Sequence, residues 1–258
     1  MRAAFVVIAV VGVAALFAGC ASQEARAVRS GDLESIRAYL AEGGDVNEPQ
    51  RGGRSLLMIA ADAGQYDSAM LLIENGADVR ARDNRNRTAL IYAAERGDRA
   101  IVQLLLEYGA IVNAQDASGD SALKEAAAGG HTQVVDVLLS AGADQDIRTD
   151  TGRTPLFYAV DNNHPRTARA LLAAGSHVNA RDEDGLSPIF FALGSDQDAV
   201  LELLLGYGAQ AAVADDEGRT PLMIAAAEEN PRAVAILLRE APATLDLEDS
   251  DGWTALLI

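Results

Sequence analysis

One unit recurs at a fixed 33-residue step along this 258-residue chain, and this period constrains the fold more than any other feature. Each copy is recognised by a Ser or Thr, two residues that are usually Pro, Ala or Leu, and then in most copies an apolar residue. The seven copies begin at Ser55, Thr88, Ser121, Thr154, Ser187, Thr220 and Thr254, so the step is constant until the last copy, which lies a single position later. A fixed period of this length indicates an array in which each unit packs against its neighbours.

The copies carry the same turn and helix signals in the same register. Two residues before the Ser or Thr stands a Gly in six copies and Asn86 in the other, and these residue types tolerate the positive φ of a tight turn. We expect the Ser or Thr hydroxyl to cap a helix whose first turn holds Pro155, Pro188 or Pro221 in three copies. A second apolar run follows, for example at 101–106, so each unit is predicted to contain two short helices.

These features resemble ankyrin repeats over residues 22–258. The resemblance is carried by Thr154-Pro155-Leu156, by Gly208-Ala209 and by the 33-residue step. It implies an all-α repeat solenoid of stacked helix pairs with β-turn or hairpin fingers between them. The His that the family places after the Pro-Leu pair is absent here, so packing must contribute more to holding the array together.

The register predicts the organisation of the repeats. Residues 22–49 form a degenerate N-terminal capping repeat with polar substitutions, residues 50–248 form six ankyrin repeats, and residues 249–258 begin an incomplete seventh repeat. An apolar surface exposed at that incomplete repeat would favour self-association or contact with a partner.

The first nineteen residues have the pattern of a secretory signal peptide. Arg2 precedes an apolar run over 3–19, and the only Cys of the chain, Cys20, follows directly. The segment 16–20 resembles the lipobox of bacterial lipoproteins, although Phe17 stands where that family prefers Leu. The resemblance implies that residues 1–19 are removed and that residues 20–21 are a lipidated Cys and a minimal tether. An uncleaved membrane helix and an ordinary signal peptide are the alternatives.

Acylation at Cys20 would place the chain in the bacterial cell envelope, facing the periplasm. Ala21, which follows the Cys, is similar to the residue found in lipoproteins of the outer membrane, so the outer membrane is favoured over the inner one.

Charge and residue content argue against several classes of function. The chain has 38 acidic and 21 basic residues, a formal charge of −17, whereas nucleic-acid binding requires clustered Lys and Arg. One Cys and three His do not supply a zinc site, and the acidic run 182–184 lacks the ligand spacing of a calcium loop. We therefore expect no catalytic residue, no metal, no cofactor and no small-molecule substrate.

The charge of the fingers changes along the array. The second finger, residues 77–87, carries four Arg and has a net charge of +2, whereas every later finger is acidic. These four Arg surround Asp83, and they either pair with local Asp residues or meet anionic lipid head groups. The acidic distal half favours a basic protein partner.

Ankyrin solenoids resemble one another in binding proteins through their fingertips and the concave ends of their first helices. The variable positions at these places are Arg51, Arg54, Arg85, Arg87, Glu95, Arg96, Asp150, Arg153, Asp161, Asn162, Glu183, Asp184, Asp216, Glu217, Arg219 and Glu228. The sequence thus predicts a non-catalytic protein-binding module tethered to the envelope. The alternatives are an immunity-type lipoprotein that neutralises a toxin or effector delivered into the periplasm, and an accessory factor that supports a periplasmic stress-response enzyme.

Overall fold

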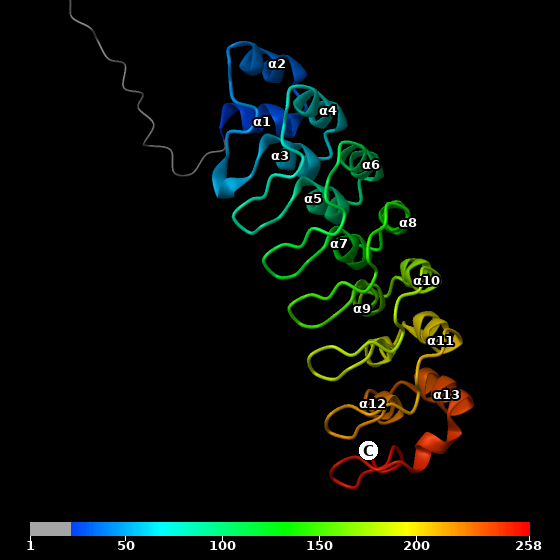
Figure 1. The fold of residues 1–258 in the computed structure, drawn as a ribbon. Helices are drawn as coiled ribbons and strands as arrows, with labels where there is room; N and C mark the ends of the chain where they lie inside the picture. Colours follow the sequence, from blue (N-terminus) through cyan, green and yellow to red (C-terminus); the bar gives the residue numbers. More distant parts are fainter. Residues whose placement is uncertain (1–21) are drawn as a thin grey trace, which may run out of the picture.

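Pairs of short helices stack side by side along residues 22–258, which are the residues that this computed structural model describes (Figure 1). The first helices of the pairs are α1 (Gln23–Ser30), α3 (Leu56–Ala63), α5 (Ala89–Arg96), α7 (Ala122–Ala128), α9 (Pro155–Asp161), the 3₁₀ helix η2 (Pro188–Ala192) and α12 (Pro221–Ala227). The second helices are α2 (Leu33–Ala41), α4 (Tyr66–Glu74), α6 (Arg99–Glu107), α8 (Thr132–Ser140), α10 (Pro165–Ala173), α11 (Asp198–Gly206) and α13 (Pro231–Glu240). The chain is an all-α repeat solenoid, as the sequence predicts.

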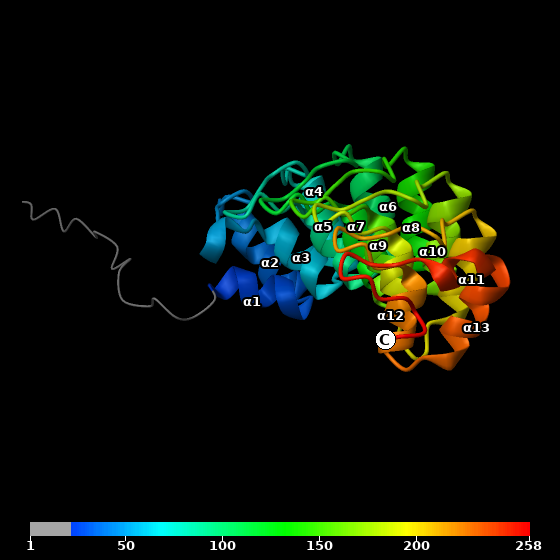
Figure 2. The same ribbon diagram turned by 90° about the horizontal axis from the view of Figure 1, so that it is seen from below.

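The stack curves, with the second helices on its outer side and the first helices inside (Figures 1 and 2). Fingers project from the first-helix layer, and two further 3₁₀ turns, η1 (Arg51–Gly53) and η3 (Pro242–Asp246), complete the helical segments. Among residues 22–258 the only β-type pairing is one antiparallel bridge between Gln115 and Ser121. The fingers are therefore turns, and single main-chain hydrogen bonds join neighbouring tips, such as Ala117 N to Arg85 O at 2.8 Å.

The turn that precedes each first helix has the backbone that its glycines predict. The residue two before the cap has a positive φ in all seven copies, and Asn86, the one non-glycine, has φ of 61°. A side chain at Gly152 would also meet the next finger, because a Cβ there would lie 2.9 Å from Glu183 N. Glycine at this place permits both the turn and the close approach of the fingers.

Hydroxyl capping occurs in only part of the array. The cap hydroxyl accepts from the third helical amide at Ser55, Thr88, Ser121 and Thr220. At Thr154 and Ser187 the prediction is wrong, and both hydroxyls are buried without a hydrogen-bond partner. The reason is that Phe157 N and Phe190 N donate instead to the main-chain carbonyls of Thr154 and Ser187, at 3.0 and 3.1 Å.

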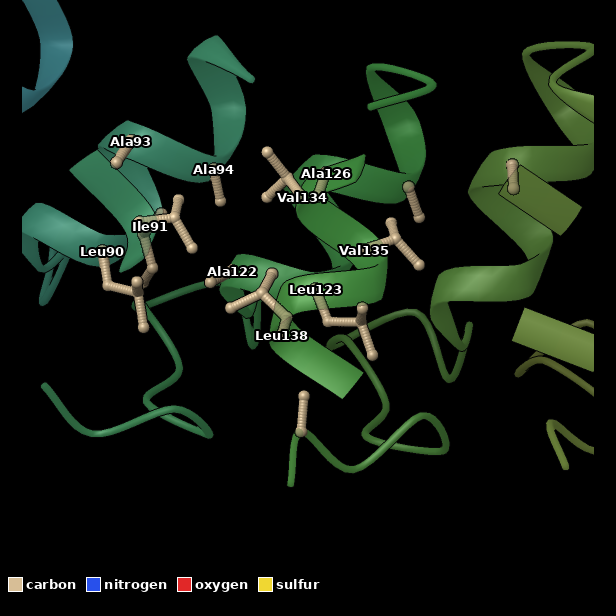
Figure 3. Close-up of a cluster of buried hydrophobic side chains, with 14 of the residues drawn as sticks. Leu90, Ile91, Ala93, Ala94, Ala122, Leu123, Ala126, Val134, Val135 and Leu138 are labelled. Atoms are coloured by element: carbon tan, nitrogen blue, oxygen red, sulfur yellow. The ribbon is translucent and has the colours of Figure 1, made fainter. Parts of the chain in front are cut away.

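The core runs unbroken between successive units. Figure 3 shows Leu90, Ile91, Ala93 and Ala94 of α5 with Ala122, Leu123 and Ala126 of α7 and Val134, Val135 and Leu138 of α8, and all ten side chains are at most 2% exposed. The alanines let neighbouring first helices approach closely. One helix pair could not bury these apolar stripes by itself, so each unit is stabilised by the next.

The fifth unit, counted from the copy that begins at Ser55, departs from the predicted pattern. Its first helix is a five-residue 3₁₀ segment, η2, followed by an irregular stretch before α11. Ala192 and Leu193 stand where most other units have an Ala-Ala pair, and Gly194, a weak helix former, follows. The glycine disfavours the longer first helix of the other units.

We expect Gly152→Ala to destabilise the array more than Gly142→Ala. Both glycines have a positive φ, 75° and 84°, where alanine costs about 1 kcal/mol or more. Only Gly152 faces a close neighbour, since a Cβ at Gly142 would meet nothing within 4 Å. Overpacking should add about 1 kcal/mol or more at Gly152. Urea unfolding of both variants measures the difference, and equal losses would contradict the close approach of the fingers.

Candidate functional site

Two positions of each unit line up along the inner side of the stack, and we call the surface they form the inner face. One is the residue just before the cap, namely Arg54, Arg87, Asp120, Arg153, Leu186 and Arg219. The other is the fourth residue after the cap, namely Ile59, Tyr92, Glu125, Tyr158, Phe191 and Ile224. Because the repeat has a constant length, each residue of a row lies near its equivalents in the neighbouring units.

In the second unit, one aromatic ring is held between two cations. The guanidinium carbons of Arg54 and Arg87 each lie 4.3 Å from the centroid of the Tyr92 ring. The Tyr92 hydroxyl donates to Asp83 Oδ2 at 2.7 Å, and burial together with this bond raises the pKa of Tyr92. Two cation–π contacts and one charge-assisted hydrogen bond thus fix the ring.

The Asp83 carboxylate accepts three hydrogen bonds. The donors are the Tyr92 hydroxyl and the main-chain amides of Arg85 and Arg87, the last two at 2.8 and 2.9 Å. Arg80 donates to Gly109 O, just before the next finger, at 2.9 Å, and Arg82 donates to Gln115 O within that finger at 2.7 Å. Two of the four arginines therefore connect neighbouring units.

Carboxylates extend the network along the inner face. Arg54 pairs with Asp62 at 2.8 Å, and Arg87 lies 2.6 Å from Glu95 and 3.6 Å from Glu125. The next cation, Lys124, bonds Asp120 at 2.8 Å and stands 4.7 Å from the Tyr158 ring centroid. In the proximal half of the inner face, cations and carboxylates are therefore paired with one another.

Glu125 and Lys124 of this charge network both have shifted pKa values. Burial is the largest cause for Glu125. It raises the pKa of Glu125, and the carboxylates of Asp120 and Glu95 act in the same direction against the cations Lys124 and Arg87. Burial alone would lower the pKa of Lys124, but the hydrogen bond to Asp120 and the charges of Glu125 and Asp120 outweigh it, so that pKa is raised.

The distal half of the inner face is more apolar. Arg153 lies 4.3 Å from the Phe191 ring centroid and pairs with the buried Asp182 at 2.9 Å. The Phe191 ring meets Phe157 edge to face, with centroids 5.7 Å apart. The partly exposed apolar side chains here are Tyr158, Leu186, Phe191 and Ile224 of the two rows, together with Phe190, which directly precedes Phe191.

Most of the sixteen residues predicted to bind a partner are exposed on the fingers or on the ends of the first helices. Three of them, Arg54, Arg87 and Arg153, are partly buried and hold rings and carboxylates of the array itself. The prediction also missed the aromatic rings and cations that contact one another along the inner face, which we call the ring ladder. An aromatic residue four positions after the cap, at Tyr92, Tyr158 and Phe191, was the available signal.

The three histidines each have a partner within the stack. His131 Nε2 and His164 Nε2 lie 3.1 Å from Glu95 O and Ala128 O, which stand at the end of the first helix of the preceding unit. His177 Nδ1 lies 2.6 Å from Asp146 Oδ2. Across the described residues, 22–258, no group of three His, Cys, Asp or Glu is arranged to hold a metal ion.

A cavity of about 720 Å³ lies at the proximal end of the inner face, beside α1 and the first finger, and its lining includes Ser22, Arg29, Arg51 and Arg54. Cys20 precedes this part of the chain and lies outside the described residues. Within those residues, no helix combines the length and apolar character that a membrane crossing requires.

We expect Glu125→Gln to stabilise the protein near pH 7. A carboxyl with a raised pKa binds its proton more tightly in the folded state, so its contribution to stability is complete below the unfolded pKa and lost as pH rises through the folded pKa. The variant cannot ionise, so its advantage should disappear below about pH 4. Thermal unfolding across this range tests it, with the exposed Glu74 of α4 as the Glu→Gln control. A variant less stable than the wild type at pH 7 would contradict the assigned cause.

Comparison with known protein families identifies the repeat. The family described as ankyrin repeats (3 copies) matches residues 25–116, 112–182 and 189–258, which together span nearly all of the solenoid. No curated protein matches the chain. Ankyrin repeats are generally non-catalytic modules for protein interaction. This match agrees with the 33-residue period and with the positive-φ turns that precede the first helices. The chain belongs to the ankyrin-repeat family.

Proposed function

We propose that this chain is a non-catalytic binding module, tethered to the bacterial envelope at Cys20 and facing the periplasm, that captures a basic protein through its fingertips and inner face. The observation that carries the proposal is the unpaired acidity of the distal fingertips. Ankyrin repeats supply the expectation of a protein partner, and the charge pattern of this chain supplies the sign of that partner's surface.

The fifth and sixth fingers each contain one carboxylate that holds the turn and others that do not. Asp182 is 7% exposed and accepts from Asp184 N at 3.1 Å and Leu186 N at 2.9 Å. Asp215 accepts in the same way from Glu217 N at 3.1 Å and Arg219 N at 2.7 Å. These two carboxylates are used by the fold and are not available to a partner.

The outward-facing acids of the same fingers lack such roles. Glu183, Asp184 and Asp216 are exposed, and their carboxylates make no ion pair within residues 22–258. The Glu217 carboxylate forms one ion pair in the described part of the chain, with the exposed Arg219 at 3.3 Å. Unpaired charges of one sign speed the approach of an oppositely charged surface and select against like-charged ones.

The tether rests on the lipobox-like segment and on its distance from the solenoid. Ser22 caps α1, and Cys20 is only two residues earlier, a reach of about 7 Å at most. Acyl chains on Cys20 would therefore hold the proximal end of the stack at the membrane surface and leave the acidic distal fingers farther from it.

We expect Cys20→Ala to abolish both membrane partitioning and a lipid-sized gain in intact mass when the full chain is expressed in a bacterium. The thiol is the acceptor of the diacylglycerol in the proposal, and alanine removes it. Fractionation and intact mass spectrometry give the two readouts. A Cys20→Ala chain that stays in the membrane would contradict lipid anchoring and leave the uncleaved helix as the anchor.

We expect reversal of Asp184, Asp216 and Glu217 to Lys to weaken capture of a basic protein from envelope extracts by about tenfold. Three rim charges at about 0.5 kcal/mol each give this size. The control reverses three exposed acids on the outer helices, Asp67, Glu74 and Glu107. Equal capture by wild type and fingertip variant, or an equal loss in the control, would contradict binding through the fingertips.

A further inference from the structure

We infer that the distal inner face, defined by Tyr158, Leu186, Phe190, Phe191 and Ile224, binds a protein segment with a large apolar side chain next to a Lys or Arg. This rests on the proposed function, because it describes the part of the basic partner that touches the stack. At this face the ring ladder lacks one of the cations that it has around Tyr92.

The interruption is at Leu186. In the second unit, Tyr92 lies between Arg54 of the preceding unit and Arg87 of its own unit. In the fifth unit, Phe191 has the first of these cations, Arg153, but its own unit has Leu186 where Arg87 would stand. Phe191 therefore keeps one half of a cation–π sandwich, and a partner's cation can supply the other half.

The 3₁₀ geometry of η2 adds apolar surface at the same place. The residues equivalent to Phe190 include Met58, Ile91, Phe157 and Met223, all at most 1% exposed. Phe190 is partly exposed, and the small residues 194–195 follow in place of further helix. An aromatic ring is thus presented where other apolar equivalents are fully buried, which favours an apolar anchor on the partner.

The rings are fixed before a partner arrives. Phe191 is held by its edge-to-face contact with Phe157 at 5.7 Å and by Arg153 at 4.3 Å. Arg153 is in turn bonded to Asp182, whose side chain is 1% exposed. A preorganised surface loses little side-chain entropy on binding, so a short segment can bind it.

The charge around the distal inner face selects the sign of the occupant. Its two cations are already neutralised, since Arg153 pairs with Asp182 and Arg219 with Asp215 at 2.9 and 2.8 Å. Exposed acids lie on the fingertips and at the ends of the first helices: Asp161, Glu183, Asp184, Asp196, Asp216, Glu217, Glu228 and Glu229. This surplus favours a cationic segment and opposes a second copy of a chain whose formal charge is −17.

The decisive variant is Leu186→Arg, which restores in the fifth unit the arrangement seen around Tyr92. The new guanidinium can pair with the aromatic ring and with fingertip carboxylates, so the variant should fold. It would occupy the place over Phe191 and repel the partner's cation. Leu186→Met keeps an apolar side chain there, and Gln133→Arg adds the same charge at an exposed site on α8.

The probe is a labelled nonapeptide with a central Trp-Leu pair flanked by Lys on both sides, titrated with the full chain at about 0.15 M salt and followed by fluorescence anisotropy. Matched peptides carry Ser-Ser in place of Trp-Leu, or Glu in place of Lys. We expect the Lys peptide to bind, the Glu peptide not to bind, and the Ser-Ser peptide to bind about tenfold more weakly. Leu186→Arg should weaken binding of the Lys peptide about tenfold, while Leu186→Met and Gln133→Arg leave it unchanged.

Several results would overturn the inference. Equal binding of the Trp-Leu and Ser-Ser peptides would show attraction by charge alone, and equal binding by Leu186→Arg, folded by circular dichroism, would place the peptide elsewhere. Wild-type dimers that Leu186→Arg dissociates would assign the face to a second copy. If the peptide fails but fingertip reversal still weakens partner capture, only this inference falls. If fingertip reversal has no effect either, the proposed function falls with it.

Discussion

The contact between successive first helices is the interaction on which the rest of this structure depends. A helix pair has an apolar stripe that only the next pair can cover, and Ala93-Ala94 of α5 and Ala126-Ala127 of α7 bring the pairs close enough to cover it. Because that interface recurs with the constant period of the sequence, each position of the unit returns at the same place on the surface. The inner face is a consequence, since its two rows of side chains exist only when the units are in register.

Because the units are in register, side chains at equivalent positions of neighbouring units contact one another and form the ring ladder. Around Tyr92 the ladder is closed, because cations from two units cover the ring and carboxylates neutralise the cations. Around Phe191 the same geometry holds one cation and one leucine. In the proximal half of the inner face these side chains therefore stabilise the stack. In the distal half Phe191 has one cation where Tyr92 has two, and a partner can supply the second. The two halves differ in side chains at equivalent places and in the 3₁₀ form of the fifth first helix.

The solenoid could be predicted from the sequence because glycine, asparagine and proline act locally. Asn86 takes φ of 61° where its equivalents are glycines, and Pro165 and Pro231 begin α10 and α13 as first-turn prolines. The lack of hydroxyl caps at Thr154 and Ser187 could not be predicted, since the amide three residues on can donate either to the hydroxyl or to the main-chain carbonyl of the cap residue. The role of Arg153 could not be predicted either. Its partners, Asp182 and Phe191, belong to the next unit and meet it only in the stack.

The net charge of a finger, counted from the sequence, overstates the charge that a partner can contact. In five of the seven fingers one carboxylate holds the turn by accepting two main-chain amides, at Asp83, Asp116, Asp182, Asp215 and Asp249. In the second finger this use leaves arginines in excess, yet two of them donate to neighbouring carbonyls. In the fifth and sixth fingers the surplus is acidic and outward-facing, and Arg153 and Arg219 are held by the structural carboxylates. The carboxylates available to a partner are thus those that do not hold a turn. In this chain they lie beside Leu186 and Phe191, where the ring ladder is interrupted.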